Sequence, residues 1–221
     1  HSIARRQRQM CIRDRCNSPE PWMQLDIFPQ DWTSSINKIR TYTVIVHEYF
    51  HVYQRALSHR VGCLSNNSAK WLVEGGAKVL EEIYSRQYYK KDLLKSDIQE
   101  RKRWSIKKVT REPHLYEQHK TSPQKNGFDS NYAGSAFMLL ALVNELKKNN
   151  ISEEEAFELV FREYWIQRAK YTPSGTAWQV AFKDTFGMSH DEFYERLSKY
   201  KRKDLKKILP SKTLKIQDIF S

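Results

Sequence analysis

The sequence has little cysteine and no long hydrophobic run among its 221 residues. Its three cysteines, Cys11, Cys16 and Cys63, are too few and too scattered to predict a disulfide framework. No apolar stretch approaches the roughly 18 residues that a membrane-spanning helix needs, so the chain has no predicted transmembrane segment. Internal repeats and low-complexity segments are also absent. These absences favour a single globular domain over a disulfide scaffold, a membrane protein or a repeat array.

Basic residues are in excess, giving a formal net charge of +12. We interpret residues 1–16 as a non-native segment, because residues 4–15 resemble translated sequencing-adapter sequence and carry five arginines against one aspartate. Without that stretch the net charge is nearer +8, and a native N-terminus with any targeting signal would be missing. We therefore expect a domain over residues 17–203, followed by a basic and mobile tail over 204–221.

Apolar residues recur at helical spacing through most of the chain, and serines that can cap helices precede several of these stretches. The pattern predicts helices over about 36–58, 69–89, 93–104, 132–148, 153–165, 175–185 and 190–203. Ser68 is the expected cap of the second helix, and Ser152 and Ser189 begin capping boxes. Residues 59–67 and the stretch from 104 to about 125 are expected to be loops. The predicted class is mainly α, with an α+β remnant of at most one short edge strand at 23–28.

The most informative stretch of the sequence is His47-Glu48-Tyr49-Phe50-His51. Two histidines four residues apart lie one above the other on one face of a helix. Glu48 would lie beside the gap between the two imidazoles. In this H-E-x-x-H arrangement the two histidines bind Zn2+ and the glutamate acts on the water bound to the ion.

A two-histidine zinc site needs a third protein ligand, which leaves one position open for water or substrate. Glu74, on the next predicted helix, is the candidate. Gly75 and Gly76 follow it, and each weakens a helix by roughly 1 kcal/mol relative to alanine. Their presence predicts that another element approaches this helix closely.

The two motifs together, His-Glu-x-x-His and Trp71-Leu-Val-Glu-Gly-Gly-Ala77, resemble those of the gluzincin metallopeptidases, in particular the peptidase MA-like group. Residues 181–193 are similar to the C-terminal helices of that group. A metzincin would have Gly at position 54 and His at 57, where this chain has Gln54 and Leu57. The resemblance implies a zincin-like fold with an active-site helix and a glutamate helix, a bound Zn2+, and a peptide or protein substrate. Because relatives are often exported or associated with the bacterial cell envelope, such a location is an expectation, although the sequence leaves it open.

The resemblance also implies roles for individual residues. Glu48 would be the general base that takes a proton from the zinc-bound water and passes it to the leaving amine. Tyr132 is the candidate donor to the developing oxyanion, because related aminopeptidases carry a tyrosine at about this distance after the metal-binding glutamate. His114 and His119 are rival candidates for that role.

One position departs from the family pattern. Some gluzincins carry an acid four residues after the metal-binding glutamate, where it accepts a hydrogen bond from a ligating histidine. Here that position is Lys78. Glu81 and Glu82, one turn further along, are the possible substitutes.

Two alternatives remain open from the sequence. The first is a catalytically inactive domain that zinc stabilises and whose degenerate cleft binds a partner. The second is a basic helical module for nucleic acid or an anionic surface, based on the basic stretches at 86–125 and in the tail. No nucleic-acid-binding motif is present, so nucleic acid is not the expected partner. The sequence does not indicate cleavage specificity or oligomeric state.

Overall fold

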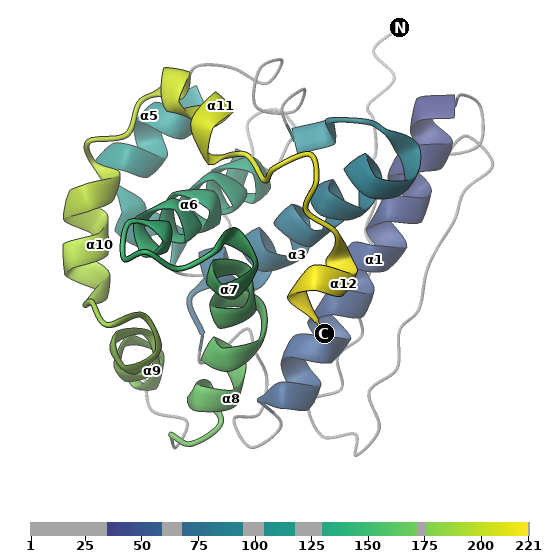
Figure 1. The fold of residues 1–221 in the computed structure, drawn as a ribbon. Helices are drawn as coiled ribbons and strands as arrows, with labels where there is room; N and C mark the ends of the chain where they lie inside the picture. The colour runs from purple at the N-terminus through teal and green to yellow at the C-terminus, as the bar shows by residue number, and fades with distance from the viewer. Residues whose placement is uncertain (1–34, 59–67, 95–103, 118–129, 172–175, 221) are drawn as a thin grey trace, which may run out of the picture.

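The computed structural model describes residues 35–58, 68–94, 104–117, 130–171 and 176–220 (Figure 1). Over these ranges the regular elements are all helices, and no strand is present. The mainly α class predicted from the sequence is therefore confirmed for the described chain. The predicted strand at 23–28, residues 1–16 and the three cysteines lie outside the described residues.

Three long helices form the centre of the molecule (Figure 1). Helix α3 (Lys70–Tyr84) packs between α1 (Ser35–Leu57) and α6 (Ser130–Lys147). Because α3 has neighbours on both sides, most of its side chains are buried, as expected for a helix inside a core. The apolar face predicted for it is buried throughout, namely Trp71, Leu72, Val79, Leu80 and Ile83. A π-helical turn, η3 (Ser85–Tyr89), continues α3.

The two glycines of α3 lie at these helix crossings. A Cβ atom on Gly75 would be 2.5 Å from the backbone oxygen of Ser135 in α6. A Cβ on Gly76 would be 2.9 Å from the ring of Phe50 and 3.2 Å from the amide nitrogen of Gln54, both in α1. The close approach predicted from the sequence is confirmed, and it holds Glu74 at a fixed distance from α1.

Shorter helices surround this centre. They are α5 (Trp104–Arg111), η4 (Pro113–Tyr116), α7 (Glu153–Glu158), η5 (Leu159–Glu163), α8 (Tyr164–Arg168), α9 (Ala177–Phe186) and α10 (His190–Leu197). The elements α7, η5 and α8 form one continuous helix with a π-helical middle. Both predicted capping boxes are present, with the Ser152 and Ser189 hydroxyls accepting from Glu155 and Glu192 amides.

The structure corrects two local predictions. Ser68 does not cap α3, because the N-cap is Ala69 and the buried Ser68 hydroxyl makes no hydrogen bond. Instead, the Lys70 amide donates to the backbone oxygen of Glu117. The stretch after residue 104, expected to be loop, contains α5 and η4. Helix α5 forms because Ile106 and Val109 are one turn apart and both are buried.

The C-terminal segment is also more ordered than the mobile tail expected from the sequence. It contains η6 (Arg202–Asp204), α11 (Leu205–Ile208) and α12 (Ile216–Ile219), drawn in yellow in Figure 1. Four of its apolar side chains are buried, those of Leu205, Ile208, Leu214 and Ile219.

The last described residue packs against α1 and η5. The Phe220 ring stacks on Phe161, with centroids 6.2 Å apart, and meets Tyr53 of α1 edge-on at 5.4 Å. Arg86 donates to the backbone oxygen of Pro210, which ties the same segment to η3. The C-terminal segment therefore packs against α1, α3 and α7 together and braces α1 at Tyr53.

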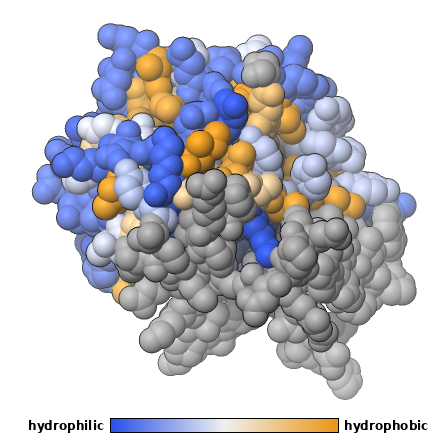
Figure 2. All heavy atoms as spheres, turned by 90° about the horizontal axis from the view of Figure 1, so that it is seen from below, coloured by the Kyte–Doolittle hydropathy of each residue, from blue (hydrophilic) through white to orange (hydrophobic). Residues whose placement is uncertain are grey.

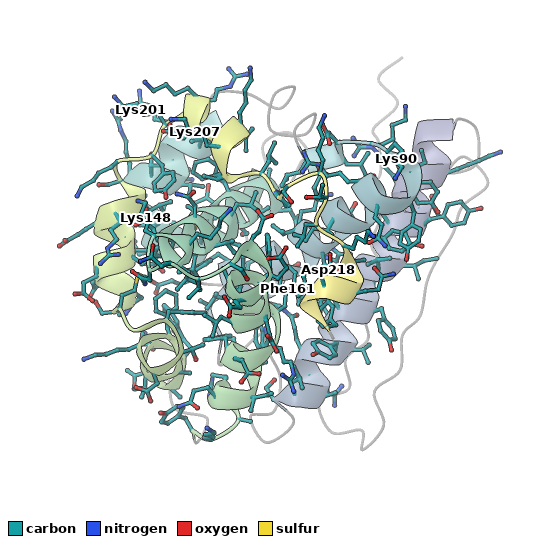
Figure 3. All side chains as sticks on the ribbon, in the orientation of Figure 1. Lys90, Lys148, Phe161, Lys201, Lys207 and Asp218 are labelled. Atoms are coloured by element: carbon teal, nitrogen blue, oxygen red, sulfur yellow. The ribbon has the colours of Figure 1, made fainter. Side chains whose placement is uncertain are left out.

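The surface carries both apolar and polar side chains. Figure 2 shows apolar residues among hydrophilic ones on the described part of the face that is below in Figure 1. Figure 3 shows charged side chains projecting from the outer helices. Among the described residues, no helix combines the length and the hydrophobicity that crossing a membrane requires.

Candidate metal centre

Helices α1 and α3 bring three potential metal ligands together. The Nε2 atoms of His47 and His51 are each 3.5 Å from the same oxygen, Oε2 of Glu74. One donor atom from each of the three residues lies within 4.8 Å of the other two. The two imidazoles are 4.9 Å apart and nearly perpendicular, so their Nε2 atoms converge although the rings do not stack. The sequence prediction named these three residues, and the structure places them together.

The spacing of these atoms fits a zinc ion. Zinc binds histidine nitrogen and carboxylate oxygen at about 2.0–2.2 Å, so two ligands at a tetrahedral angle are about 3.4 Å apart. The two observed nitrogen–oxygen separations are close to that value. Oε2 of Glu74 is also buried and accepts no hydrogen bond. A buried carboxylate needs a positive charge beside it, which either a protonated imidazole or a metal cation at this position would supply.

A glutamine fixes the orientation of His51. The Oε1 atom of Gln54 lies 2.8 Å from Nδ1 of His51, and the Nε2 atom of Gln54 donates to the backbone oxygen of Val73 at 3.1 Å. Because the second bond uses the amide nitrogen, the amide oxygen faces the imidazole and accepts its Nδ1–H. The lone pair of His51 is then on Nε2, which faces Glu74. Metal-bound histidines usually have such a partner on their second nitrogen.

A carboxylate takes the corresponding place beside His47. Oε2 of Glu81 is 3.6 Å from Nδ1 of His47, while Oε1 of Glu81 accepts from the Thr43 hydroxyl at 3.0 Å. Lys78 pairs with Glu81 at 2.9 Å. The lysine that departs from the gluzincin pattern therefore contacts the carboxylate beside His47, one turn along the same helix. Of the two predicted substitutes, Glu81 is the one that reaches the histidine.

Glu82 lies elsewhere. Its carboxylate accepts from the backbone amide of Leu94 at 2.6 Å and pairs with Arg86 at 3.1 Å. Burial raises the pKa of Glu82 to about 7, despite the hydrogen bond from Leu94 and the charge of Arg86. These contacts join α3 to residues 86–94 and do not involve the histidines.

The charges of the cluster favour a cation. Burial lowers the pKa of His47, but the Glu74 and Glu81 carboxylates outweigh it and raise that pKa to about 9. Burial raises the pKa of Glu74, but His51 and His47 outweigh it and hold that pKa far below its usual range. In the metal-free protein, His47 is accordingly protonated at neutral pH and Glu74 is ionised. The proton on His47 occupies the place that a metal ion would take.

Glu48 is placed next to this cluster. It is 8% exposed, and burial raises its pKa although the adjacent His47 and His51 lower it. A carboxylate with a raised pKa takes up a proton more readily near neutral pH, which a general base requires. A group of this kind beside a candidate metal site is typical of a catalytic position.

Tyr132 also lies at the cluster. Its ring centroid is 5.8 Å from that of His47, although α3, α5 and η4 lie between the two residues in the sequence. Lys70 of α3 places its ammonium 5.9 Å from the Tyr132 ring. The rival candidates are not brought to the site by the described residues: His114 is exposed in η4, and His119 lies outside the described residues.

Sequence reasoning missed Gln54. In the sequence motif, position 54 serves only to exclude a metzincin, which would have glycine there. Its spacing from His51 was the available signal, since residues three apart on a helix are neighbours. The bond to Val73 could not be predicted, because it depends on how closely α3 approaches α1.

Comparison of the chain with protein-family models, curated proteins and solved structures found no match. The likeness to gluzincins therefore depends on the two sequence motifs. The geometry of the candidate centre is the independent observation beside them.

Proposed function

We propose that this protein is a zinc-dependent peptidase of gluzincin type with a zincin-like arrangement of α1 and α3. The observation that carries the proposal is the convergence of the His47 and His51 Nε2 atoms on one buried oxygen of Glu74 that accepts no hydrogen bond. The partners on the second nitrogens of both histidines support it, because they aim the lone pairs at that point.

The donor set limits the choice of metal. Two imidazoles and one carboxylate suit a catalytic zinc ion, but the same set also occurs in non-haem iron oxygenases. Glu48 favours hydrolysis over metal binding alone. Binding needs only the three ligands, whereas a fourth ionisable group beside the centre can transfer protons. A zinc ion held by His47, His51 and Glu74 would activate water at neutral pH and polarise a substrate carbonyl.

Side chains of the protein would transfer the protons and hold the substrate carbonyl and the two imidazoles in place. Glu48 would accept a proton from the attacking water and deliver it to the leaving amine. Tyr132 would donate a hydrogen bond to the oxygen of the scissile carbonyl as charge develops there. Gln54 and Glu81 keep the two imidazoles in the orientation in which their lone pairs face the centre.

Two measurements test this proposal. Metal analysis of the purified protein should find about one zinc per chain, with the zinc lost in Glu74→Ala and in His51→Ala. Bound iron in place of zinc would contradict the assignment. The wild-type protein should also cleave members of a peptide library in a chelator-sensitive manner.

The variant Glu48→Gln separates catalysis from binding. It should retain the metal and lose peptide cleavage by a factor of about 10² or more, since it removes the general base. If the zinc-loaded wild-type protein cleaves nothing, the protein is instead a zinc-stabilised binding domain. Unchanged cleavage by Glu48→Gln would refute the assigned role of Glu48.

A further inference from the structure

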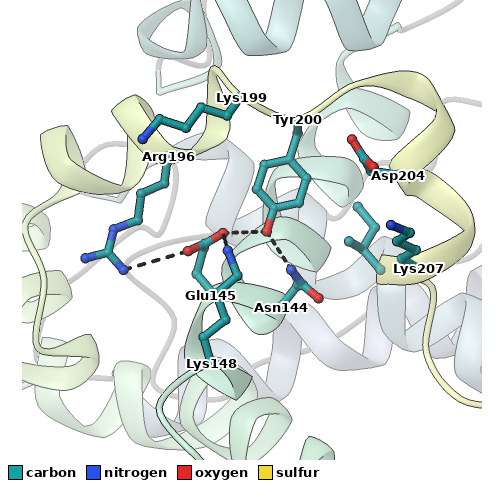
Figure 4. A pocket seen from close by; sticks show the side chains of 9 residues that line it. Asn144, Glu145, Lys148, Arg196, Lys199, Tyr200, Asp204 and Lys207 are labelled. Carbon is teal, nitrogen blue, oxygen red and sulfur yellow. Dashed lines mark hydrogen bonds and ion pairs between the residues drawn. The ribbon is translucent and has the colours of Figure 1, made fainter.

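A second site is indicated by a cavity of about 440 Å³ that shares no residue with the candidate metal centre (Figure 4). It lies between the C-terminal end of α6, α10 and α11. The charged side chains around it are Lys148, Arg196, Lys199, Lys207, Glu145 and Asp204. Four positive and two negative groups leave an excess of positive charge. The volume is within the range of about 300–1,000 Å³ that small-ligand sites occupy.

The negative charge of Glu145 is already compensated within the protein. This carboxylate is 3% exposed, and its Oε1 accepts from the Tyr200 hydroxyl and from Lys148, both at 2.5 Å. Arg196 is 3.7 Å from its other oxygen. Asn144 donates to the Tyr200 hydroxyl, which completes a polar floor. Glu145 thus fixes the floor of the cavity, as the dashed lines in Figure 4 show.

Two of the cations lack a comparable partner. Among the described residues, no acid lies within ion-pair distance of Lys199 or Lys207, and both are exposed. Asp204 accepts from the backbone amide of Lys201 at 2.8 Å. The positive charge of Lys199 and Lys207, which line the cavity with Arg196, is therefore not neutralised by a described acid and is available to a bound anion.

The segment next to the cavity is also positively charged. Residues 196–215 contain nine basic residues and one acid. Burial of Leu205 and Ile208 anchors this segment and turns Lys206 and Lys207 outward. Figure 3 shows Lys148, Lys201 and Lys207 on the same side of the molecule, with Lys90 on the opposite side. A fixed cluster of this kind attracts anions from solution.

We infer that this cavity binds a phosphate group, contacted by Arg196, Lys199 and Lys207 above the floor formed by Glu145 and Tyr200. Guanidinium groups recognise phosphate through paired hydrogen bonds, and lysines add charge from any direction. The phosphate could be carried by a soluble molecule or by the headgroup of an anionic lipid. The exposed lysines beside the cavity would add contacts if neighbouring phosphates are present, as on a lipid surface.

Calorimetric titration of the full chain with inorganic pyrophosphate tests the inference. Saturable binding at one site is expected, weakened at least about tenfold by Arg196→Gln and by Lys207→Gln, because each removes a direct charged contact. Lys207→Gln is the cleaner variant, since Lys207 has no internal partner whose loss would disturb the fold. Lys183→Gln, which removes an exposed lysine on α9, is the matched control and should bind as the wild type does.

Vesicle sedimentation identifies the source of the phosphate. Binding to phosphatidylcholine vesicles containing phosphatidylglycerol, but not to phosphatidylcholine alone, and its loss in Lys207→Gln would indicate a lipid headgroup. Pyrophosphate binding without vesicle binding would indicate a soluble phosphate. Absence of saturable pyrophosphate binding, or equal weakening by Lys183→Gln, would overturn the inference. Nucleic-acid binding that Lys207→Gln leaves intact, without pyrophosphate binding, would also overturn it in favour of an extended basic surface.

Discussion

The hydrogen bond from His51 to Gln54 gives the sharpest prediction about the candidate centre. Gln54 has no solvent exposure and makes two side-chain hydrogen bonds, to His51 and to the backbone of Val73. The substitution Gln54→Leu keeps most of the volume and removes both bonds. The Val73 backbone oxygen is within α3 and keeps its place in the hydrogen bonding of that helix. The Nδ1–H of His51, in contrast, loses its acceptor.

The cost of this loss falls mainly on the metal-bound state. In the metal-free protein the His51 ring can carry its hydrogen on Nε2, facing Glu74, and leave Nδ1 without one. With a metal on Nε2 the hydrogen must be on Nδ1, where it would be buried without an acceptor. Such a loss costs about 1–3 kcal/mol. That energy corresponds to about a 5- to 150-fold increase in the metal dissociation constant.

Competition titration against a coloured chelator at fixed pH measures this change. The matched control is Ser58→Ala, immediately after the same helix, which removes the buried 2.6 Å hydrogen bond from the Ser58 hydroxyl to the Gln54 backbone oxygen. It should lower the free energy of unfolding by about 1 kcal/mol and leave zinc affinity unchanged. Wild-type zinc affinity in Gln54→Leu, or an equal loss in Ser58→Ala, would refute the reasoning.

Three further predictions concern protons and packing. Because the pKa of His47 in the metal-free protein is about 9, protons compete with zinc for this residue. The affinity for zinc should therefore rise about tenfold per pH unit between pH 6.5 and 9. A zinc affinity that does not change with pH would contradict the assignment of His47 as a ligand. In the chelated protein the same raised pKa stabilises the fold fully below the unfolded value of about 6.5, and this contribution is lost as the pH rises through 9. Urea unfolding of the chelated protein should therefore show a free energy of unfolding lower at pH 9.5 than at pH 6 by up to about 3 kcal/mol, and no decrease would show that the carboxylates do not hold the proton. Gly75→Ala should lower the free energy of unfolding by about 1–3 kcal/mol or more, because its Cβ would clash with the Ser135 backbone. A variant with the same thermal unfolding midpoint as the wild type would show that α6 can move away from α3 at no cost.

The helices were predictable from the sequence because local signals mark them. The spacing of the apolar side chains in α3 and the capping boxes at Ser152 and Ser189 depend on residues within a few positions of one another. Failures occurred where a distant contact replaces a local one. Ser68 is followed by a helix, yet the Lys70 amide is satisfied by Glu117.

The candidate centre was predictable to a similar extent. His47 and His51 share a helix face by spacing alone, and Glu74 follows from the resemblance of its motif. The contact of Glu81 with His47 remained one of two possibilities, because residues 81 and 82 face different sides of α3 and only the packing against α1 distinguishes them. No sequence motif marks the proposed phosphate site, because Glu145 and Tyr200 come together only when α10 packs against α6.

The packing of Phe220 against α1 has a consequence for biosynthesis. The ribosome delivers His47, His51 and Glu74 well before Phe220, whose ring contacts Tyr53 of α1 and Phe161. Contacts between such distant positions form late in folding. A nascent chain would therefore expose His47, His51 and Glu74 before their helix is fully supported, and we expect the candidate metal centre to become stable only once Phe220 has been synthesised.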